Sequence, residues 1–70
     1  MNLAFAPFNT ELTVTKINAD EKTSRHLKNL GILVGGKIVS MFDNGGNVIV
    51  KVKDCKLAIN KALAMKICVA

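Results

Sequence analysis

The sequence contains no tryptophan or tyrosine, and only three phenylalanines, two cysteines and one proline occur among its 70 residues. Barrels that bind single-stranded nucleic acid and grooves that bind proline-rich peptides are lined with aromatic side chains, so this composition disfavours both kinds of partner. Two cysteines, Cys55 and Cys68, are too few for the disulfide framework of a small secreted domain. A single disulfide between them is left open.

Long apolar runs are also missing. No segment approaches the roughly 20 apolar residues that span a bilayer, which predicts no direct insertion into a membrane. The apolar start Met1–Phe8 lacks a basic flank and is interrupted by Pro7, so it does not match a signal peptide. We therefore expect a reduced, cytoplasmic protein. The segment Leu3–Phe8 leaves two alternatives open: it closes the fold of its own chain, or it packs against a second copy in a homo-oligomer.

Acidic residues are half as numerous as basic ones, five against ten, which leaves a net charge of +5. Residues 1–35 carry four basic and three acidic side chains, whereas residues 36–70 carry six and two, a net charge of +4. This half is predicted to be a solvated face, or to attract nucleic-acid phosphates or an acidic protein surface. A chain of 70 residues forms a single domain, over residues 1–70, without a deep substrate cleft.

Alternation of apolar and polar residues predicts five short strands. The most regular alternation places Val48, Val50 and Val52 on one face of an extended segment. The five predicted segments are Leu12–Ile17, Lys37–Phe42, Val48–Lys53, Leu57–Ile59 and Ile67–Val69.

Turn and cap residues separate these strands. Asp20 is a predicted N-cap for a helix that ends at Gly31, and Asn60 caps one further turn of helix. Asn44-Gly45 predicts a hairpin, and Asp54–Lys56 a second turn. Short strands at this spacing indicate an all-β fold with minor α content: a small, partly open barrel of about five strands, with one helix inserted after the first. Phe5, Phe8 and Phe42 are expected to contribute to its core.

The segment Gly31–Ile38 matches a phosphate-binding loop except at its last position, where Ile38 replaces the Ser or Thr that holds magnesium. The predicted order is also reversed, because this loop follows a helix and precedes a strand. We interpret it as a helix end followed by a tight turn.

Residues for catalysis or metal binding show no recognisable spacing. His26, Cys55 and Cys68 are far apart in the sequence, and a closed zinc site requires four ligands. The acidic residues form no pair suited to acid–base work, and His26 has no polar partners nearby in the sequence. We predict no catalytic residues, no metal ligands and no cofactor. Weak transition-metal binding through His26 and the cysteines is kept as an alternative.

In combination, several motifs resemble the FeoA family, small cytosolic proteins of bacterial ferrous iron uptake. The likeness extends from about Glu11 to Val69 and rests on these segments: Arg25-x-Leu27-x-x-Leu30-Gly31-Ile32-x-x-Gly35, the glycine-containing hairpin, Leu57-Ala58-Ile59 and Ala64-x-x-Ile67-x-Val69. The chain departs from the family pattern at Val34, where proline is common, and at Asn9–Glu11, where a Pro-Gly turn is common.

The resemblance implies an SH3-like barrel, in agreement with the strand count. It also implies a non-catalytic accessory of the membrane ferrous iron permease that contacts the cytoplasmic GTP-binding (GTPase) region of that permease. The same module occurs in metal-responsive repressors. The alternative function is a small basic barrel that binds nucleic acid or responds to a metal.

Four residues are predicted to contact the partner. Leu33 and Val34 are apolar in a segment predicted to be a loop, so they either anchor a partner or fill the core beneath the loop. Lys51 and Lys53 are predicted to project together from one strand face and to steer an acidic partner.

Overall fold

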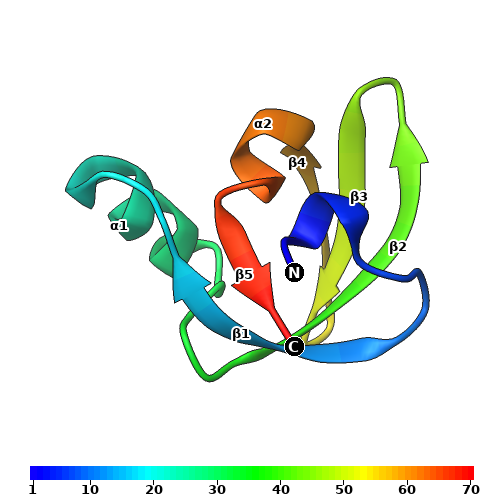
Figure 1. The fold of residues 1–70 in the computed structure, drawn as a ribbon, viewed down its shortest axis with the longest axis horizontal. Helices are drawn as coiled ribbons and strands as arrows, with labels where there is room; N and C mark the ends of the chain where they lie inside the picture. Colours follow the sequence, from blue (N-terminus) through cyan, green and yellow to red (C-terminus); the bar gives the residue numbers. More distant parts are fainter.

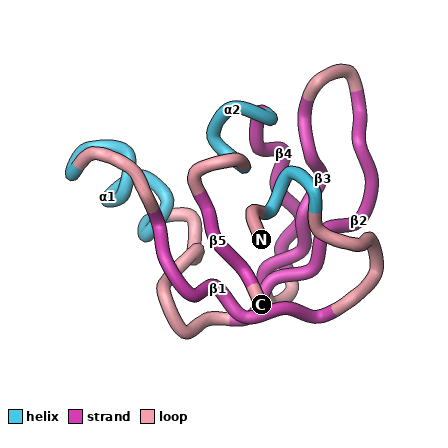
Figure 2. Tube along the Cα trace, in the orientation of Figure 1, coloured by secondary structure: helices cyan, strands magenta, loops and turns pink.

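Strands make up most of the chain, and the computed structural model describes all 70 residues (Figure 1). Two α-helices and one short 3₁₀ helix interrupt the strands (Figure 2). The elements run in the order η1 Leu3–Phe5, β1 Glu11–Ile17, α1 Glu21–Asn29, β2 Lys37–Asn44, β3 Asn47–Val52, β4 Cys55–Asn60, α2 Lys61–Ala64 and β5 Ile67–Val69.

The five strands form one antiparallel sheet in the order β4-β3-β2-β1-β5. The sheet curls so that β1 crosses below β5 and lies alongside the start of β2, while β3 and β4 stand behind (Figure 1). The predicted architecture is confirmed: an all-β SH3-like barrel of about five strands with a helix after the first strand.

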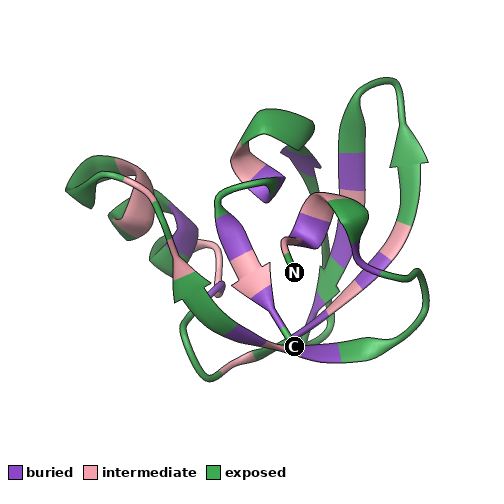
Figure 3. Cartoon of the chain, in the orientation of Figure 1, coloured by how far each residue is buried: buried purple, intermediate pink, exposed green.

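The core forms where the strand pattern alternates. On β3 the side chains of Val48, Val50 and Val52 are buried, as predicted from the sequence. These valines join a cluster of 14 buried apolar residues, shown in purple in Figure 3. Since pleated strands point alternate side chains to opposite faces, Ile49 and Lys51 are left on the outer face of the sheet.

Helix α1 begins and ends where the sequence indicates. The Asp20 side chain accepts a hydrogen bond from the Thr23 N–H at 2.7 Å, and Gly31 follows the helix with a φ of +94°. Of the nine helical residues only Leu27 is buried, so a single side chain joins the helix to the core. The predicted short helix is also present: α2 is capped by Asn60, whose side chain accepts from the Leu63 N–H at 2.7 Å.

Both hairpins turn at positions slightly different from those predicted. The β2–β3 loop consists of Gly45 and Gly46, with φ of +58° and +88°, because Asn44 and Asn47 pair as the last strand residues. The β3–β4 turn was predicted over Asp54–Lys56, but Val52 already pairs with Cys55, and the turn is therefore Lys53 and Asp54.

The prediction that three phenylalanines enter the core is wrong, because Phe5, Phe8 and Phe42 are all exposed. In η1, three residues make one turn, so Leu3 and Ala6 share the buried face and Phe5 points to solvent. Phe42 follows an irregularity in the β2–β3 register between Ser40 and Phe42, which moves its side chain to the outer face.

The segment Leu3–Phe8 packs against its own chain through Leu3 and Ala6, in agreement with the first of its two predicted alternatives. Asn2 forms a bridge with Cys68, the Val69 N–H donates to the Met1 carbonyl at 2.8 Å, and the Asn9 N–H donates to the Ser40 carbonyl at 2.7 Å. The N-terminal segment therefore spans the barrel from β5 to β2.

Candidate functional site

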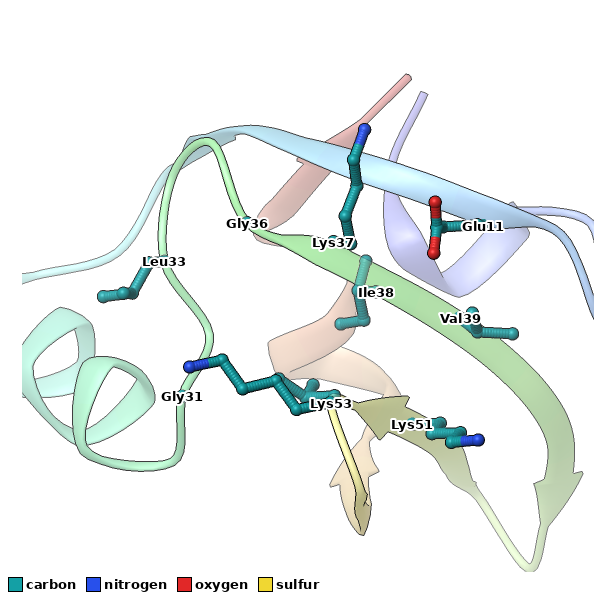
Figure 4. A pocket seen from close by; sticks show the side chains of 10 residues that line it. Glu11, Gly31, Leu33, Gly36, Lys37, Ile38, Val39, Lys51 and Lys53 are labelled. Atoms are coloured by element: carbon teal, nitrogen blue, oxygen red, sulfur yellow. The ribbon is translucent and has the colours of Figure 1, made fainter.

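The molecule has one surface hollow, of about 370 Å³, which we call the lysine groove (Figure 4). The start of β1 and β2, the loop after α1 and the end of β3 form its walls. Its lining residues are Glu11, Gly31, Leu33, Gly36, Lys37, Ile38, Val39, Lys51, Val52 and Lys53. Three of the four residues predicted from the sequence to contact a partner, Leu33, Lys51 and Lys53, therefore lie around one hollow.

The loop between α1 and β2 is held by its backbone. The Ile32 side chain is buried, and its N–H donates to the Leu27 carbonyl at 2.9 Å. The Gly35 N–H donates to the Val14 carbonyl at 2.7 Å, which fastens the far end of the loop to β1. Leu33 and Val34 lie between these two anchors and are 43% and 61% exposed. The alternative that they fill the core is wrong, since Ile32 occupies that position.

Lys51 and Lys53 do not share a strand face as predicted. Lys51 lies on the outer face of β3, whereas Lys53 is in the turn that follows, because this turn begins one residue earlier than expected. Lys53 has a φ of +55°, which few residues other than glycine, asparagine and aspartate adopt. Its side chain extends from the turn toward Gly31, across the lower side of the groove (Figure 4).

Sequence reasoning missed the residues that β1 and β2 bring to the groove. Lys37 follows Gly36, and its ammonium donates to the Thr13 hydroxyl at 2.7 Å. Glu11 is the one acidic residue in the lining. The alternation that predicted the two strands contained no information on their mutual register, which places Glu11 opposite Val39 and Thr13 opposite Lys37.

The structure also decides the interpretation of the apparent phosphate-binding segment. Its three glycines use their amides internally: Gly31 donates to Lys28, Gly35 to Val14 and Gly36 to Leu33, at 2.7–3.0 Å. A phosphate cradle requires such amides to be free. The segment follows α1 and precedes β2, and the interpretation as a helix end and turn is confirmed.

The candidate metal ligands lie on separate elements. His26 is on α1, Cys55 begins β4 and Cys68 is on β5, and nowhere do three His, Cys, Asp or Glu side chains gather. Both cysteines are free thiols, so the disulfide left open by the sequence is not formed. The Cys68 sulfur accepts a hydrogen bond from the Asn18 side-chain amide at 3.6 Å. None of the helices has both the length and the apolar character needed to cross a membrane.

The class of protein follows from this geometry: a five-stranded SH3-like barrel that carries an exposed loop beside a surface groove. The model of the FeoA domain matches residues 1–70, and the chain belongs to the FeoA family. This match confirms the resemblance seen in the sequence. The family is associated with ferrous iron transport.

Individual relatives agree with this assignment. The chain is 39% identical over 67 residues to a protein of Methanocaldococcus jannaschii provisionally named Fe(2+) transport protein A, and covers 96% of itself and 82% of that protein. FeoA from Chlorobium tepidum has a similar fold, with a TM-score of 0.89 at 22% identity over 99% of this chain and 68% of that one.

A further solved structure carries the same fold. FeoA from Stenotrophomonas maltophilia, crystallised with zinc and described as a prokaryotic SH3 domain protein, matches with a TM-score of 0.85 at 22% identity, over 100% of this chain and 89% of that one. At this level of identity the likeness shows the fold alone.

Proposed function

We propose that this chain is a non-catalytic interaction module that regulates a ferrous iron transporter by binding its cytoplasmic GTP-binding region. The match to the FeoA domain over the whole chain carries the proposal. Such a role places the protein in the cytoplasm, where the GTP-binding region lies. The proposed contact surface consists of Leu33 and Val34 together with the lysine groove beside them.

Several features of the surface support a contact role. Apolar side chains that are exposed on a well-anchored loop can enter a partner's surface without a cost for ordering the loop. The backbone hydrogen bonds of Ile32 and Gly35 hold Leu33 and Val34 in place on either side. Lys51 and Lys53 would steer an acidic partner toward the same face.

The binding of the purified protein to the cytoplasmic region of the ferrous iron permease tests this proposal, with GTP, with GDP and without nucleotide. Biolayer interferometry with this 70-residue chain immobilised and the permease region in solution measures the binding. We expect saturable binding that the double substitution L33S/V34S weakens by about tenfold or more. Met65→Ser is the matched control, since Met65 is an exposed apolar residue of similar size outside the loop. Absence of binding in all three nucleotide states would end the proposal.

The lining of the groove does not favour the alternative of nucleic-acid binding. The lysine groove contains no aromatic side chain on which a base could stack, and Phe5, Phe8 and Phe42 are not among its lining residues.

A further inference from the structure

The lysines around the groove have no acidic partners within the molecule. The chain has two ion pairs, Arg25–Glu21 at 3.0 Å and Lys61–Asp43 at 3.6 Å, and both lie outside the groove. Lys37, Lys51 and Lys53 therefore present three ammonium groups with no carboxylate within 4.0 Å, although Glu11 lines the same hollow. With Glu11 as the one carboxylate in the lining, the groove keeps an excess of positive charge.

A fourth lysine adds to this charge in an unfavourable way. Lys56 lies directly opposite Lys51 in the β3–β4 pair, and both residues are exposed. Opposite residues of an antiparallel pair project from the same face, so the two ammonium groups repel each other and destabilise the hairpin. Folding alone gives no reason for this arrangement.

Lys53 also has a backbone conformation that its side chain disfavours. Its φ of +55° is adopted more easily by glycine or asparagine, which would complete the same turn. Strained residues of this kind concentrate at functional sites. Here the lysine gives the groove a cation that extends toward Gly31 (Figure 4).

The rest of the groove indicates which kind of anion it suits. Val39 is half-buried and Leu33 is exposed, so these two residues provide the accessible apolar surface of the lining, whereas Ile38 and Val52 are almost fully buried. The amides of the lining glycines Gly31 and Gly36 are already used within the loop, and the lining has no aromatic group. The groove therefore offers a phosphate or a nucleotide neither free backbone amides nor an aromatic stacking surface. It offers ammonium groups to carboxylates and apolar surface to an apolar side chain next to them.

We propose that the lysine groove binds an extended acidic segment of a partner protein. Carboxylates of the segment pair with Lys51 and Lys53 of the groove and with Lys56 beside it, and an apolar side chain between them rests against Val39, which lies opposite Lys51. Binding relieves the repulsion between Lys51 and Lys56, which gives the acidic segment a gain that a neutral one lacks. The inference depends on the proposed function only for the identity of the partner, because the chemistry of the segment follows from the groove.

A panel of blocked 12-residue peptides tests the chemistry without the transporter. Each peptide carries Glu or Asp residues around one Leu, Ile or Val at varied spacing, and has a matched version with Gln or Asn at every acidic position. We expect the acidic peptides to shift the amide NMR signals of Lys51, Lys53 and Gly36, and their affinity to fall about tenfold between low and high salt. If no acidic peptide binds more tightly than its amide version, the inference is wrong. GTP and inorganic triphosphate are the competing probes, and tighter binding of either would also overturn it.

Variants then assign the binding to the groove. Lys51→Glu is expected to weaken the best acidic peptide by about tenfold, while Lys22→Glu on exposed α1 makes the same charge change elsewhere and weakens it less than about threefold. Lys53→Gly is expected to weaken binding by about threefold, yet to leave Tm unchanged or raise it by up to about 5 °C. Equal effects of Lys51→Glu and Lys22→Glu would show only long-range attraction and overturn the assignment.

The same variants separate this inference from the proposed function. Loss of transporter binding in L33S/V34S with full binding in Lys51→Glu would retain the proposed function and show that the transporter does not supply the acidic segment. Binding of acidic peptides without any binding to the transporter would retain the groove chemistry and reject the proposed partner.

Discussion

At the scale of single residues, Ser40 departs from the rule that buried polar groups are hydrogen-bonded. Its side chain is fully buried on β2, and its hydroxyl is the one buried side-chain polar atom without a partner. A hydroxyl in this position loses its hydrogen bonds to water on folding and gains none in return.

We therefore expect Ser40→Ala to raise the free energy of unfolding by about 1 kcal/mol. Urea denaturation measures this change as a higher midpoint with an unchanged slope. Ser24→Ala is the matched control, because the Ser24 hydroxyl donates to the Ala19 carbonyl at 3.3 Å. That substitution is expected to lower stability by roughly 0.5–1 kcal/mol. A destabilising Ser40→Ala would mean that the hydroxyl has a partner in solution.

Asp20 links the α1 cap to pH. Its side-chain hydrogen bond with Thr23, followed by the bond from the Thr23 backbone N–H, lowers the pKa of the carboxyl in the folded protein. The folded state therefore holds the proton less tightly than the unfolded state. The contribution of the cap is complete above the unfolded pKa of about 3.9 and is lost as the pH falls through the lower folded pKa.

Asp20→Asn is expected to reduce this loss, because an amide still accepts the Thr23 N–H but does not titrate. Urea unfolding of both proteins at steps from about pH 5 to pH 2 compares the two profiles. The variant should lose less stability than the parent protein over the acid limb, with little difference in slope above that range. Parallel profiles throughout would show that the carboxylate contributes nothing that depends on its charge.

At the scale of elements, the hairpins show how turn chemistry determines register. Gly45 and Gly46 both have positive φ, and a Cβ at either position would meet nothing within 4 Å. Any cost of substitution there is therefore a backbone cost and not a clash. The two-residue loop with both φ values positive matches the twist of the flanking strands.

Gly46→Ala is expected to destabilise the protein by about 1 kcal/mol, which lowers Tm by about 4–8 °C for a chain of this size. Gly45→Asn should change stability by less than about 0.5 kcal/mol, since asparagine tolerates the left-handed region and Asn-Gly is a preferred pair in such loops. Thermal unfolding followed by circular dichroism measures both. A larger loss from Gly45→Asn than from Gly46→Ala would contradict this account of the turn.

The comparison of sequence and structure is clearest for these elements. Caps at Asp20 and Asn60 and the alternation around Val50 depend on neighbouring residues alone, and each was predicted correctly. The turn at Lys53 was misplaced because its backbone goes against the preference of lysine, which local propensity cannot anticipate. Leu33 and Lys51 were recognised separately, but the groove between them was not predictable, because it depends on the register of β2 with both β1 and β3.

At the scale of the whole molecule, the lysine-rich hairpin end and the residues that close the barrel lie in different parts of the chain. Half of the +4 charge of residues 36–70 lies at the hairpin end of β3 and β4, where Lys51, Lys53 and Lys56 outnumber Asp54. The barrel is closed elsewhere, by uncharged residues from the two ends of the chain. A small domain can thus keep an unfavourable cluster of lysines as long as its core remains intact.

The N-terminal segment contributes Leu3 to this core, so a substitution there tests how much the closure of the barrel adds to the stability of the whole domain. A domain of 70 residues has a total stability of roughly 4–10 kcal/mol, so one buried residue can decide whether it folds. Leu3 is fully buried in the core cluster, and its element η1 packs against α2 and β5, whereas Phe5, two residues later, is 70% exposed. We expect Leu3→Ala to cost about 2–5 kcal/mol, because it leaves a cavity where the segment closes the barrel.

Phe5→Ser is the matched substitution, and it should change the free energy of unfolding by less than about 0.5 kcal/mol. Urea denaturation of both variants and of the parent protein over a series of protein concentrations measures the two values. If the segment closed the barrel only in a neighbouring copy, the loss caused by Leu3→Ala would grow weaker on dilution, because the parent protein would lose the same contact. A concentration-independent loss in Leu3→Ala, with Phe5→Ser unchanged, is the expected result, and it follows from the position of Leu3 inside its own chain.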